Sequence, residues 1–315
     1  MVTERINFLI RCYWQRALRD KCFQKNWELL KFEIAKYLRQ YGSTLAKIRK
    51  EKETEVITKI STLTQRMPED LTEDDKKYLI EQQIKLDEIY RVKAEGAYVR
   101  SRKQWLEEGE KNTAYFFRLE KSRSRTNCIQ KLNIDGAVTD DPQMVSNHCL
   151  RFYRNLYKSQ YDENATKHFF EQLPQLKPIS GAQRDLCDKQ VTLEEVNLAI
   201  QQLKLNKSPG TDGLTSEFYI KFLDKLAPFL HGMISESIHK QTLPPTLYQG
   251  LLTLIPKPNK DSLLIDNWRP ICLLNNDYKI LAGILAKRLK AVLDDIIDET
   301  QTGFMKGRHI SNNIS

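Results

Sequence analysis

The segment Leu251-Leu-Thr-Leu-Ile-Pro-Lys-Pro258 is followed, after a polar stretch, by Trp268-Arg-Pro-Ile-Cys-Leu-Leu274. Each segment is typical of a short apolar strand, and the polar residues between them supply a turn, so together they predict a two-stranded β-ribbon. Proline lies on both sides of Lys257 and directly after Arg269, which restricts the backbone beside the two cations. Two such cations at one end of a ribbon fit either a triphosphate site or two merely exposed charges.

Two loops lie on either side of this ribbon in the sequence. Upstream, Thr192 and Glu195 form a capping box that begins an amphipathic helix, and the helix gives way to the turn Ser208-Pro-Gly-Thr-Asp-Gly213. This turn has neither the Gly-Lys-Ser/Thr sequence of a P-loop nor a preceding strand, so taken alone it is more typical of a structural turn than of a phosphate site. Downstream, a long helix is predicted before the loop Gln301-Thr-Gly-Phe-Met-Lys-Gly-Arg308.

The N-terminal part of the chain has the pattern of long helices. Apolar residues at three-four spacing predict one helix from Ile6 to Ile48 and beyond, with no proline before Pro68. Thr72 and Asp75 resemble a capping box that begins a second helix. Two long antiparallel helices, a projecting hairpin, are therefore expected. The alternative is an independent dimerisation coiled coil, but the apolar seam lasts for only about three heptads, the minimum for that assignment.

A basic stretch follows the second helix. Between Arg91 and Arg125 there are ten Lys or Arg residues and five Asp or Glu residues. Aromatic side chains such as Trp105, Tyr115 and Phe116 interleave with these charges, which fits nucleic-acid contacts that combine phosphate binding with base stacking. It fits equally well a helix with an aromatic core face and a solvated charged face.

The next segment predicts a small β element, a helix and a linker. Asp135-Gly136 between short apolar runs is the signature of a tight hairpin, and Asp141-Pro142 predicts a capped helix start. Residues 159–190 contain prolines, a glycine and little periodicity, which is typical of a linker. One apolar face of the predicted helix would comprise Val145, Cys149, Phe152, Tyr153, Leu156 and Tyr157.

Composition narrows the class of protein. The 315 residues carry 50 Lys or Arg and 41 Asp or Glu, a net charge of +9 that suits a polyanionic partner. Six scattered cysteines form no metal-ligand spacing, and no apolar run approaches the roughly 20 residues of a membrane span. We therefore expect no membrane association, reduced thiols, no metal site, and a location in the cytoplasm or nucleus.

These patterns define a fold class and a division of the chain. The fold expected is mainly α with small β elements (α+β), beginning with the long helical hairpin. The expected parts are residues 1–125, the hairpin and basic segment; residues 126–176, the β-hairpin and its helix; and residues 177–315, which include the ribbon.

Several blocks resemble LINE-type non-LTR retrotransposon reverse transcriptases, in matching order and spacing. They are Lys207-Ser-Pro-Gly-Thr-Asp-Gly213, Leu254-Ile-Pro-Lys257, Trp268-Arg-Pro-Ile271 and Gln301-Thr-Gly-Phe-Met-Lys-Gly-Arg308. Upstream, Gly96–Arg102, Trp105–Thr113 and the Asp135-Gly136 hairpin resemble the region that precedes the polymerase. The resemblance covers roughly residue 93 to the end and implies the fingers part of a right-hand polymerase.

The resemblance also implies site residues. Lys257 and Arg269 would contact the triphosphate of an incoming deoxynucleotide, and RNA and DNA would be the other partners. The nucleic-acid contacts would include Lys207, Gly210 and Asp212 beside the template; Gln301, Gly303, Phe304 and Arg308 at the entrance to the palm; and the basic residues Arg100, Arg102, Lys103, Arg123 and Arg125.

One departure from the family pattern concerns the catalytic carboxylates. The family carries them on palm strands, including an aromatic-Ala-Asp-Asp hairpin, and these 315 residues contain no such motif. Asp294, Asp295, Asp298 and Glu299 precede the Gly-Arg block and are expected to be solvated helix charges. The complete family enzyme would use Mg²⁺, whereas this chain is expected to have no catalytic residue and no cofactor, as an inactive polymerase fragment truncated before its palm. The alternative is a non-enzymatic RNA- or DNA-binding protein derived from a retroelement.

Overall fold

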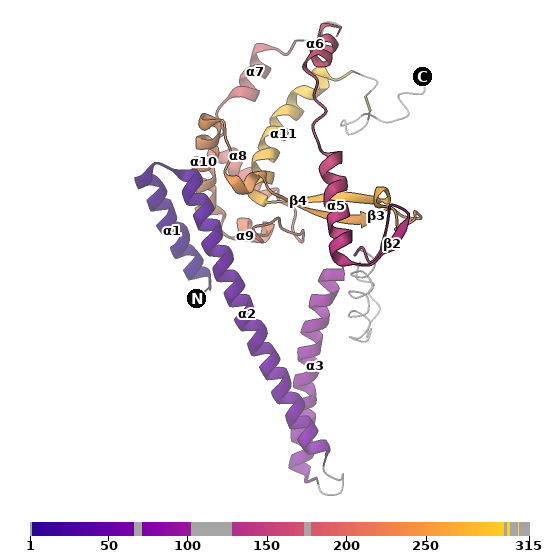
Figure 1. Cartoon of the computed structure of the whole chain (residues 1–315). Coiled ribbons are helices and arrows are strands. Elements are labelled where there is room, and N and C mark those ends of the chain that lie inside the picture. Colours follow the sequence, from indigo (N-terminus) through magenta and orange to yellow (C-terminus); the bar gives the residue numbers. More distant parts are fainter. Residues whose placement is uncertain are drawn as a thin grey trace. The chain divides into compact units, whose positions relative to one another are not determined.

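The computed structural model describes residues 2–65, 71–101, 128–172, 178–298, 301, 302 and 308, except the side chains of residues 96–101. Most of these residues are helical, and the strands form two small two-stranded sheets, which confirms the expected fold class (Figure 1). The elements are α1 (Val2–Asp20), α2 (Phe23–Thr64), α3 (Glu73–Ser101), β1 (Leu132–Ile134), β2 (Ala137–Thr139), α5 (Pro142–Leu156), α6 (Glu163–Glu171), α7 (Gly181–Asp188), α8 (Leu193–Gln201), α9 (Ser216–Lys221), α10 (Leu223–Lys240), η2 (Pro245–Tyr248), β3 (Gly250–Pro256), η3 (Ile265–Asn267), β4 (Trp268–Leu274) and α11 (Asn276–Ile296).

The chain divides into two compact units. The first comprises Met1–Lys36, Lys158–Leu252 and Cys272–Ser315, and the second comprises Tyr37–Tyr157 and Thr253–Ile271. Helix α2 and strands β3 and β4 pass from one unit into the other, so continuous backbone joins the units at several places. Each unit combines segments that are distant in sequence. The three-part division of the chain expected from the sequence remains a prediction.

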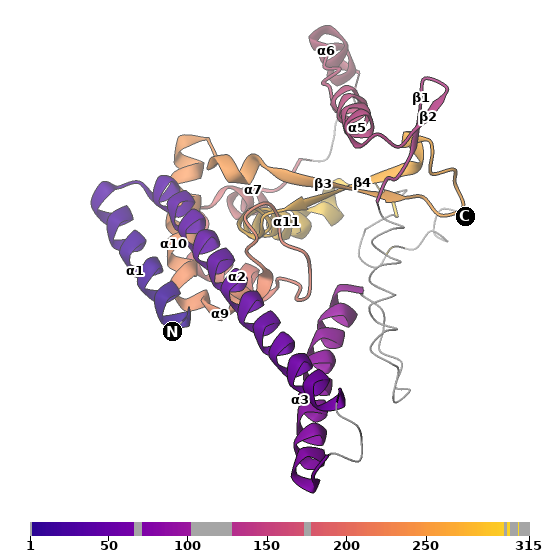
Figure 2. The same ribbon diagram turned by 60° about the horizontal axis from the view of Figure 1, so that its bottom comes forward.

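The first unit has a helical core. Helix α8 packs against both α10 and α11, and α1 lies beside α10 in both views (Figures 1 and 2). Trp14, Phe23 and Trp27 surround Phe229 of α10 with edge-to-face ring contacts, at centroid distances of 5.7, 6.1 and 5.4 Å. This geometry adds a directional contribution to the burial of apolar surface.

The N-terminal helix is interrupted where the sequence predicts continuity. Helix α1 ends at Asp20 because Lys21 adopts a left-handed conformation with φ of 48°, and the N–H of Cys22 donates to the carbonyl oxygen of Ala17. That bond is typical of a Schellman helix ending, although glycine is the usual residue at this position. The aromatic contacts with Phe229 on both sides of the turn provide a physical reason for it, because a straight helix could not bring Trp14 and Phe23 to one ring.

The helical hairpin is present within the second unit. Thr72 and Asp75 form the predicted capping box, with reciprocal backbone-to-side-chain bonds of 3.1 Å. Val56 and Leu63 of α2 and Ala94 of α3 are buried, and Lys93 pairs with Glu53 across the two helices. These contacts join the two helices within the chain. The predicted break at Pro68 lies outside the described residues.

The small β element has the predicted turn. Strands β1 and β2 are antiparallel, with Ile134 opposite Ala137, and both turn residues have positive φ, 52° at Asp135 and 88° at Gly136. Asp141 accepts a hydrogen bond from the N–H of Met144 and Pro142 occupies the first turn of α5, so the predicted cap is confirmed.

The apolar face of α5 is shorter than predicted. Val145 and Tyr153 are buried in a core that also contains Leu132 of β1, Ile265 and Trp268, and Cys149 and Phe152 pack against it. Leu156 and Tyr157 were expected on the same face but are 57% and 65% exposed. The helix ends at Leu156, so these two residues lie at its C-terminus.

The predicted linker at residues 159–190 contains two short helices, α6 and α7, so the linker prediction was wrong in this respect. Asp162 and Ser180 cap these helices with side-chain hydrogen bonds, and neither helix has a buried residue. Their first turns are capped locally, and α7 also packs against α11. Among the described residues, no helix combines the length and the apolarity needed to cross a bilayer.

Candidate functional site

The ribbon formed by β3 and β4 brings Lys257 and Arg269 to one face. The N–H of Lys257 donates to the carbonyl oxygen of Asn267 at 2.8 Å, which continues the ladder between the strands and places these two residues opposite each other. The same register places Ile255 opposite Arg269. Because opposite residues share a face and alternate residues repeat it, Lys257 and Arg269 are diagonal neighbours on one side of the ribbon.

Burial follows this alternation where the strands approach the turn, from Leu254 to Pro256 and from Trp268 to Ile271. Leu254 and Trp268 lie on the inner face and join the core beneath α5. The outer face carries Ile255 and Ile271, 39% and 42% exposed, together with the exposed Arg269. The outer face of the ribbon therefore presents two cations and two apolar side chains in a diagonal arrangement.

The two cations differ in their own contacts. The ammonium group of Lys257 donates to the carbonyl oxygen of Asp266 at 2.8 Å, which fixes the side chain beside the turn and leaves two further donors. Within the described part of the chain, the Arg269 guanidinium makes no hydrogen bond or ion pair. Its planar fork can therefore donate two hydrogen bonds to an oxyanion without breaking an interaction with another described residue.

The loop before α9 is held in place by Asn275. Gly210 approaches this residue so closely that a Cβ at Gly210 would lie 2.5 Å from the backbone nitrogen of Asn275 and 2.7 Å from the carbonyl carbon of Leu274. The Asn275 side chain accepts from the N–H of Asp212 at 3.2 Å and donates to the carbonyl oxygen of Thr246 at 3.0 Å. Gly210 thus has a structural role in this loop, which is anchored to the start of α11.

Of the two predicted template residues beside Gly210, only Lys207 points to solvent. Asp212 accepts from the N–H of Leu214 through Oδ1, and its buried Oδ2 has no partner among the described residues. Burial, assisted by the negative charge of Asp277, raises the pKa of Asp212 to about 6. Asp212 therefore faces the interior, whereas the exposed Lys207 can reach a phosphate.

A buried ion pair that was not predicted from the sequence fixes the start of α11. Lys31 of α2 lies 2.6 Å from Asp277, which also accepts from the indole N–H of Trp27 at 2.9 Å. Burial alone would lower the pKa of Lys31, but the charges of Asp277 and Glu28 outweigh it and raise the pKa. A lysine inside an otherwise apolar helix face was the single available hint, and its partner is 246 residues away.

The C-terminal candidate residues are only partly described. Arg308 donates to the carbonyl oxygens of Ile297, Asp298 and Gln301, so its guanidinium closes the turn after α11. Gln301 is exposed. Gly303 and Phe304 lie outside the described residues, as do Arg102, Lys103, Arg123 and Arg125, and the side chain of Arg100 is not described either.

The carboxylates near the end of α11 do not form a metal site in the described part of the chain. Asp295 accepts a hydrogen bond from Gln183 of α7. No group of three His, Cys, Asp or Glu side chains among the described residues could hold a metal ion. The described residues therefore offer no ligand set for a Mg²⁺ centre.

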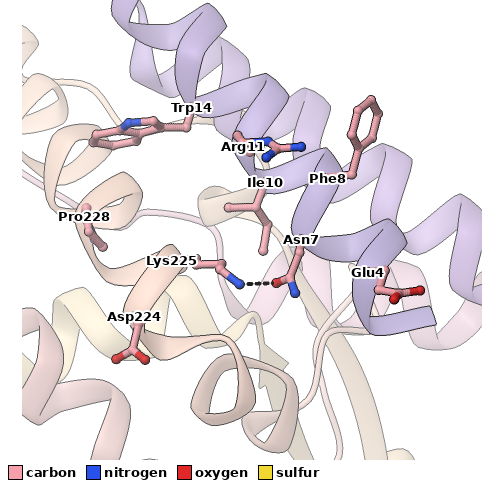
Figure 3. A pocket seen from close by; sticks show the side chains of 9 residues that line it. All are labelled: Glu4, Asn7, Phe8, Ile10, Arg11, Trp14, Asp224, Lys225 and Pro228. Carbon is pink, nitrogen blue, oxygen red and sulfur yellow. Dashed lines mark hydrogen bonds between the residues drawn. The ribbon is translucent and has the colours of Figure 1, made fainter. Parts of the chain in front are cut away.

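A groove of about 550 Å³ lies between α1 and α10 in the first unit (Figure 3). Ile10, Trp14 and Pro228 give it an apolar lining, and Lys225 donates to Asn7 across it at 2.7 Å. None of the candidate residues predicted from the sequence lines this groove.

The candidate residues fall into both units. Lys257 and Arg269 belong to the second unit, where the structure brings them together. Lys207, Gly210, Asp212, Gln301 and Arg308 belong to the first unit.

Comparison with known proteins shows a reverse-transcriptase relationship. A family model described as reverse transcriptase (RNA-dependent DNA polymerase) matches residues 255–314, a segment that contains Arg269 and Lys257. The transposon TX1 uncharacterized 149 kDa protein of Xenopus laevis is 30% identical over 97% of this chain, which corresponds to 24% of that protein.

Two further relatives come from insect mobile elements. The retrovirus-related Pol polyprotein of the type-1 retrotransposable element R1 of Bradysia coprophila is 24% identical over 61% of this chain and 18% of its own length. The RNA-directed DNA polymerase from mobile element jockey of Drosophila melanogaster is 30% identical over 36% of this chain and 13% of its own length. The chain spans about a quarter or less of these curated relatives. It is related to the reverse transcriptases of non-LTR retrotransposons.

Proposed function

We propose that this chain, related to the reverse transcriptases of non-LTR retrotransposons, supplies nucleotide and template contacts to an RNA-directed DNA polymerase. The observation that carries the proposal is the placement of the half-buried Lys257 and the exposed Arg269 on one face of the β3–β4 ribbon. Both residues lie inside the segment that the reverse-transcriptase model matches.

The chemistry of the ribbon face suits a triphosphate. The Arg269 guanidinium offers a planar pair of donors to phosphate oxygens, and the Lys257 ammonium offers a compact charge. The two ribbon cations bind and orient a polyanion, but they do not activate a primer hydroxyl. Because the sequence lacks the aromatic-Ala-Asp-Asp motif and the described residues form no metal site, we propose that these 315 residues are catalytically inactive alone.

Nucleic acid is the second partner in this proposal. The net charge of +9 favours a polyanion, and Lys207 extends from a loop anchored by Asn275. Gln301, Gly303, Phe304 and Arg308 and the basic residues Arg100, Arg102, Lys103, Arg123 and Arg125 remain proposed nucleic-acid contacts. Free cysteines at all six positions support a reducing compartment, so we place the protein in the cytoplasm or nucleus.

The test is binding of a fluorescent deoxynucleoside triphosphate to the purified chain at low salt. Lys257→Ala/Arg269→Ala should weaken binding by about tenfold or more, which corresponds to the loss of a charge-assisted contact. Lys260→Ala, an exposed cation in the same turn, is the matched control and should change the affinity by less than about twofold. Equal affinities of the double variant and the wild type would refute the triphosphate site.

Two companion assays separate the remaining alternatives. Primer extension with Mg²⁺ should give no product, and incorporation by the pure chain would overturn the proposed inactivity. Salt-dependent RNA binding that is lost when Arg100, Arg102, Lys103, Arg123 and Arg125 become Ala, without any triphosphate binding, would instead favour a non-enzymatic nucleic-acid-binding protein.

A further inference from the structure

The peptide group between Trp268 and Arg269 is anchored to α5. The Trp268 ring is 5% exposed and belongs to the core of the second unit, and its indole N–H donates to the carbonyl oxygen of Ser262 at 2.9 Å. The carbonyl oxygen of Trp268 accepts from the buried hydroxyl of Tyr153 at 3.4 Å. This carbonyl is part of the peptide bond that leads into Arg269, so the ring and the backbone on one side of the cation are both held.

The turn that follows Lys257 is anchored to β1. The N–H of Asn133 donates to the carbonyl oxygen of Leu263 at 2.9 Å, and the side chain of Asn267 donates to the carbonyl oxygen of Asp261 at 2.9 Å. Ile265, at the end of the turn, is buried in the same core as Trp268 and Tyr153. The strand ends that carry both cations are therefore attached to α5 and the β1–β2 hairpin.

A two-stranded ribbon needs such a support, because an isolated pair of strands is marginally stable in water. The outer face of this ribbon is exposed, so its stability within the second unit comes from the inner face that Leu254 and Trp268 present to α5. If that contact is lost, the ribbon can twist and the diagonal spacing of Lys257 and Arg269 changes.

We infer that Tyr153 and Trp268 are positioning residues for the ribbon cations: α5 and the β1–β2 hairpin hold the ribbon so that Lys257 and Arg269 meet one triphosphate together. The contacts above support the attachment of the ribbon to α5, and the role of that attachment in triphosphate binding rests on the proposed function. Neither Tyr153 nor Trp268 needs to touch the ligand.

The test compares substitutions at position 153 in the full chain. Tyr153→Ala should weaken triphosphate binding by about tenfold, since small misplacements of binding groups have large effects. Tyr153→Phe keeps the ring in the core and should restore the affinity to within about threefold of wild type, because it removes a single long hydrogen bond. Leu150→Ala, on the exposed side of α5, is the matched control and should bind like wild type.

Hydrogen exchange supplies a readout that does not depend on the ligand. In Tyr153→Ala, the amides of residues 253–271 should exchange faster, while those of α8 and α10 in the first unit keep their protection. If Tyr153→Ala removes protection throughout the second unit, the measurement is made instead on Tyr153→Leu, which keeps most of the apolar volume. Unchanged exchange of the ribbon amides would overturn the inference, whatever the ligand does.

The two readouts distinguish this inference from the proposed function. Binding that is lost in Lys257→Ala/Arg269→Ala but intact in Tyr153→Ala would leave the triphosphate site standing and refute the positioning role. Binding unaffected by the double variant would refute the triphosphate site, and faster ribbon exchange in Tyr153→Ala would then still establish that α5 holds the ribbon.

Discussion

The Nζ atom of Lys31 lies 2.6 Å from Oδ2 of Asp277, and the two side chains are 3% and 0% exposed. Glu28 accepts a second bond from Lys31 at 2.9 Å, and Trp27 donates to Asp277, so the buried charges are paired and hydrogen-bonded. The pair fixes the first turns of α2 to the start of α11, next to the Asn275 that anchors the loop of Lys207.

Lys31→Met should destabilise the first unit strongly. The substitution leaves the carboxylate of Asp277 buried without its cation, which typically costs about 3 to 5 kcal/mol. Urea unfolding followed by tryptophan fluorescence measures the loss, since Trp27 contacts the pair directly. Lys59→Met is the matched control: Lys59 forms an exposed pair with Glu55 on the same helix, and its loss should cost less than about 1 kcal/mol. Equal effects of the two substitutions would contradict the importance assigned to the buried pair.

The ion pair between Glu195 and Arg288 should make stability depend on pH in acid. Hydrogen bonding to Arg288, stronger than the opposing effect of burial, lowers the pKa of Glu195 from 4.5 to about 2. A carboxyl with a lowered folded-state pKa contributes stability that is complete above the unfolded pKa and is lost as pH falls towards the folded pKa. The stability difference between wild type and Glu195→Gln should therefore be constant above about pH 5 and shrink towards pH 2. A difference that is independent of pH over this range would exclude the pair as its source.

Asp212 should have the opposite effect. Burial raises its pKa from 3.8 to about 6, so the folded state binds the proton more tightly than the unfolded state. Its contribution to stability is complete below the unfolded pKa and is lost as pH rises through about 6. Asp212→Asn, which cannot ionise, should flatten the decline in stability between pH 4 and 6. Thermal unfolding at closely spaced pH values tests this, and an identical slope in the variant would count against it.

Gly210 and Gly42 should respond oppositely to alanine. A Cβ at Gly210 would collide with backbone atoms of Leu274 and Asn275, so Gly210→Ala should cost about 1 to 3 kcal/mol. Nothing lies within 4 Å of a Cβ at Gly42, in the middle of α2, so Gly42→Ala should raise stability by about 0.5 to 1 kcal/mol. Differential scanning calorimetry of both variants measures the two shifts. A neutral Gly210→Ala would show that the loop can move away from α11.

The sequence predicted the features that depend on neighbouring residues. The capping boxes at Thr72 and Thr192 and the Asp135-Gly136 turn were found because each is determined within a few positions. The two faces of the β3–β4 ribbon can also be predicted from the sequence, since side chains alternate between the faces of a strand with a period of two. Spacing alone left the role of Lys257 and Arg269 open, and the resemblance to a family favoured a role in nucleotide binding.

Other features depend on distant residues or lie among residues that are typical of a linker. The turn at Lys21 follows from the contacts of Trp14 and Phe23 with α10, more than 200 residues later. Helices α6 and α7 bury no side chain, and the prolines and the glycine around them favoured a linker prediction. Arg308 was predicted to contact template or primer, but its described bonds go to carbonyl oxygens after α11, and a contact with nucleic acid remains a prediction.

The shared core of Tyr153 and Trp268 has a consequence for synthesis on the ribosome. The two residues are 115 positions apart. At a synthesis rate of about 5 to 20 residues per second, roughly 6 to 23 s pass between the synthesis of Tyr153 and that of Trp268. During this interval Val145, Tyr153 and Leu132 are exposed together on a nascent chain, a situation in which chaperones commonly bind. The apolar face of α5 is therefore open to aggregation during co-translational folding, and a translational pause before residue 271 would lengthen that exposure.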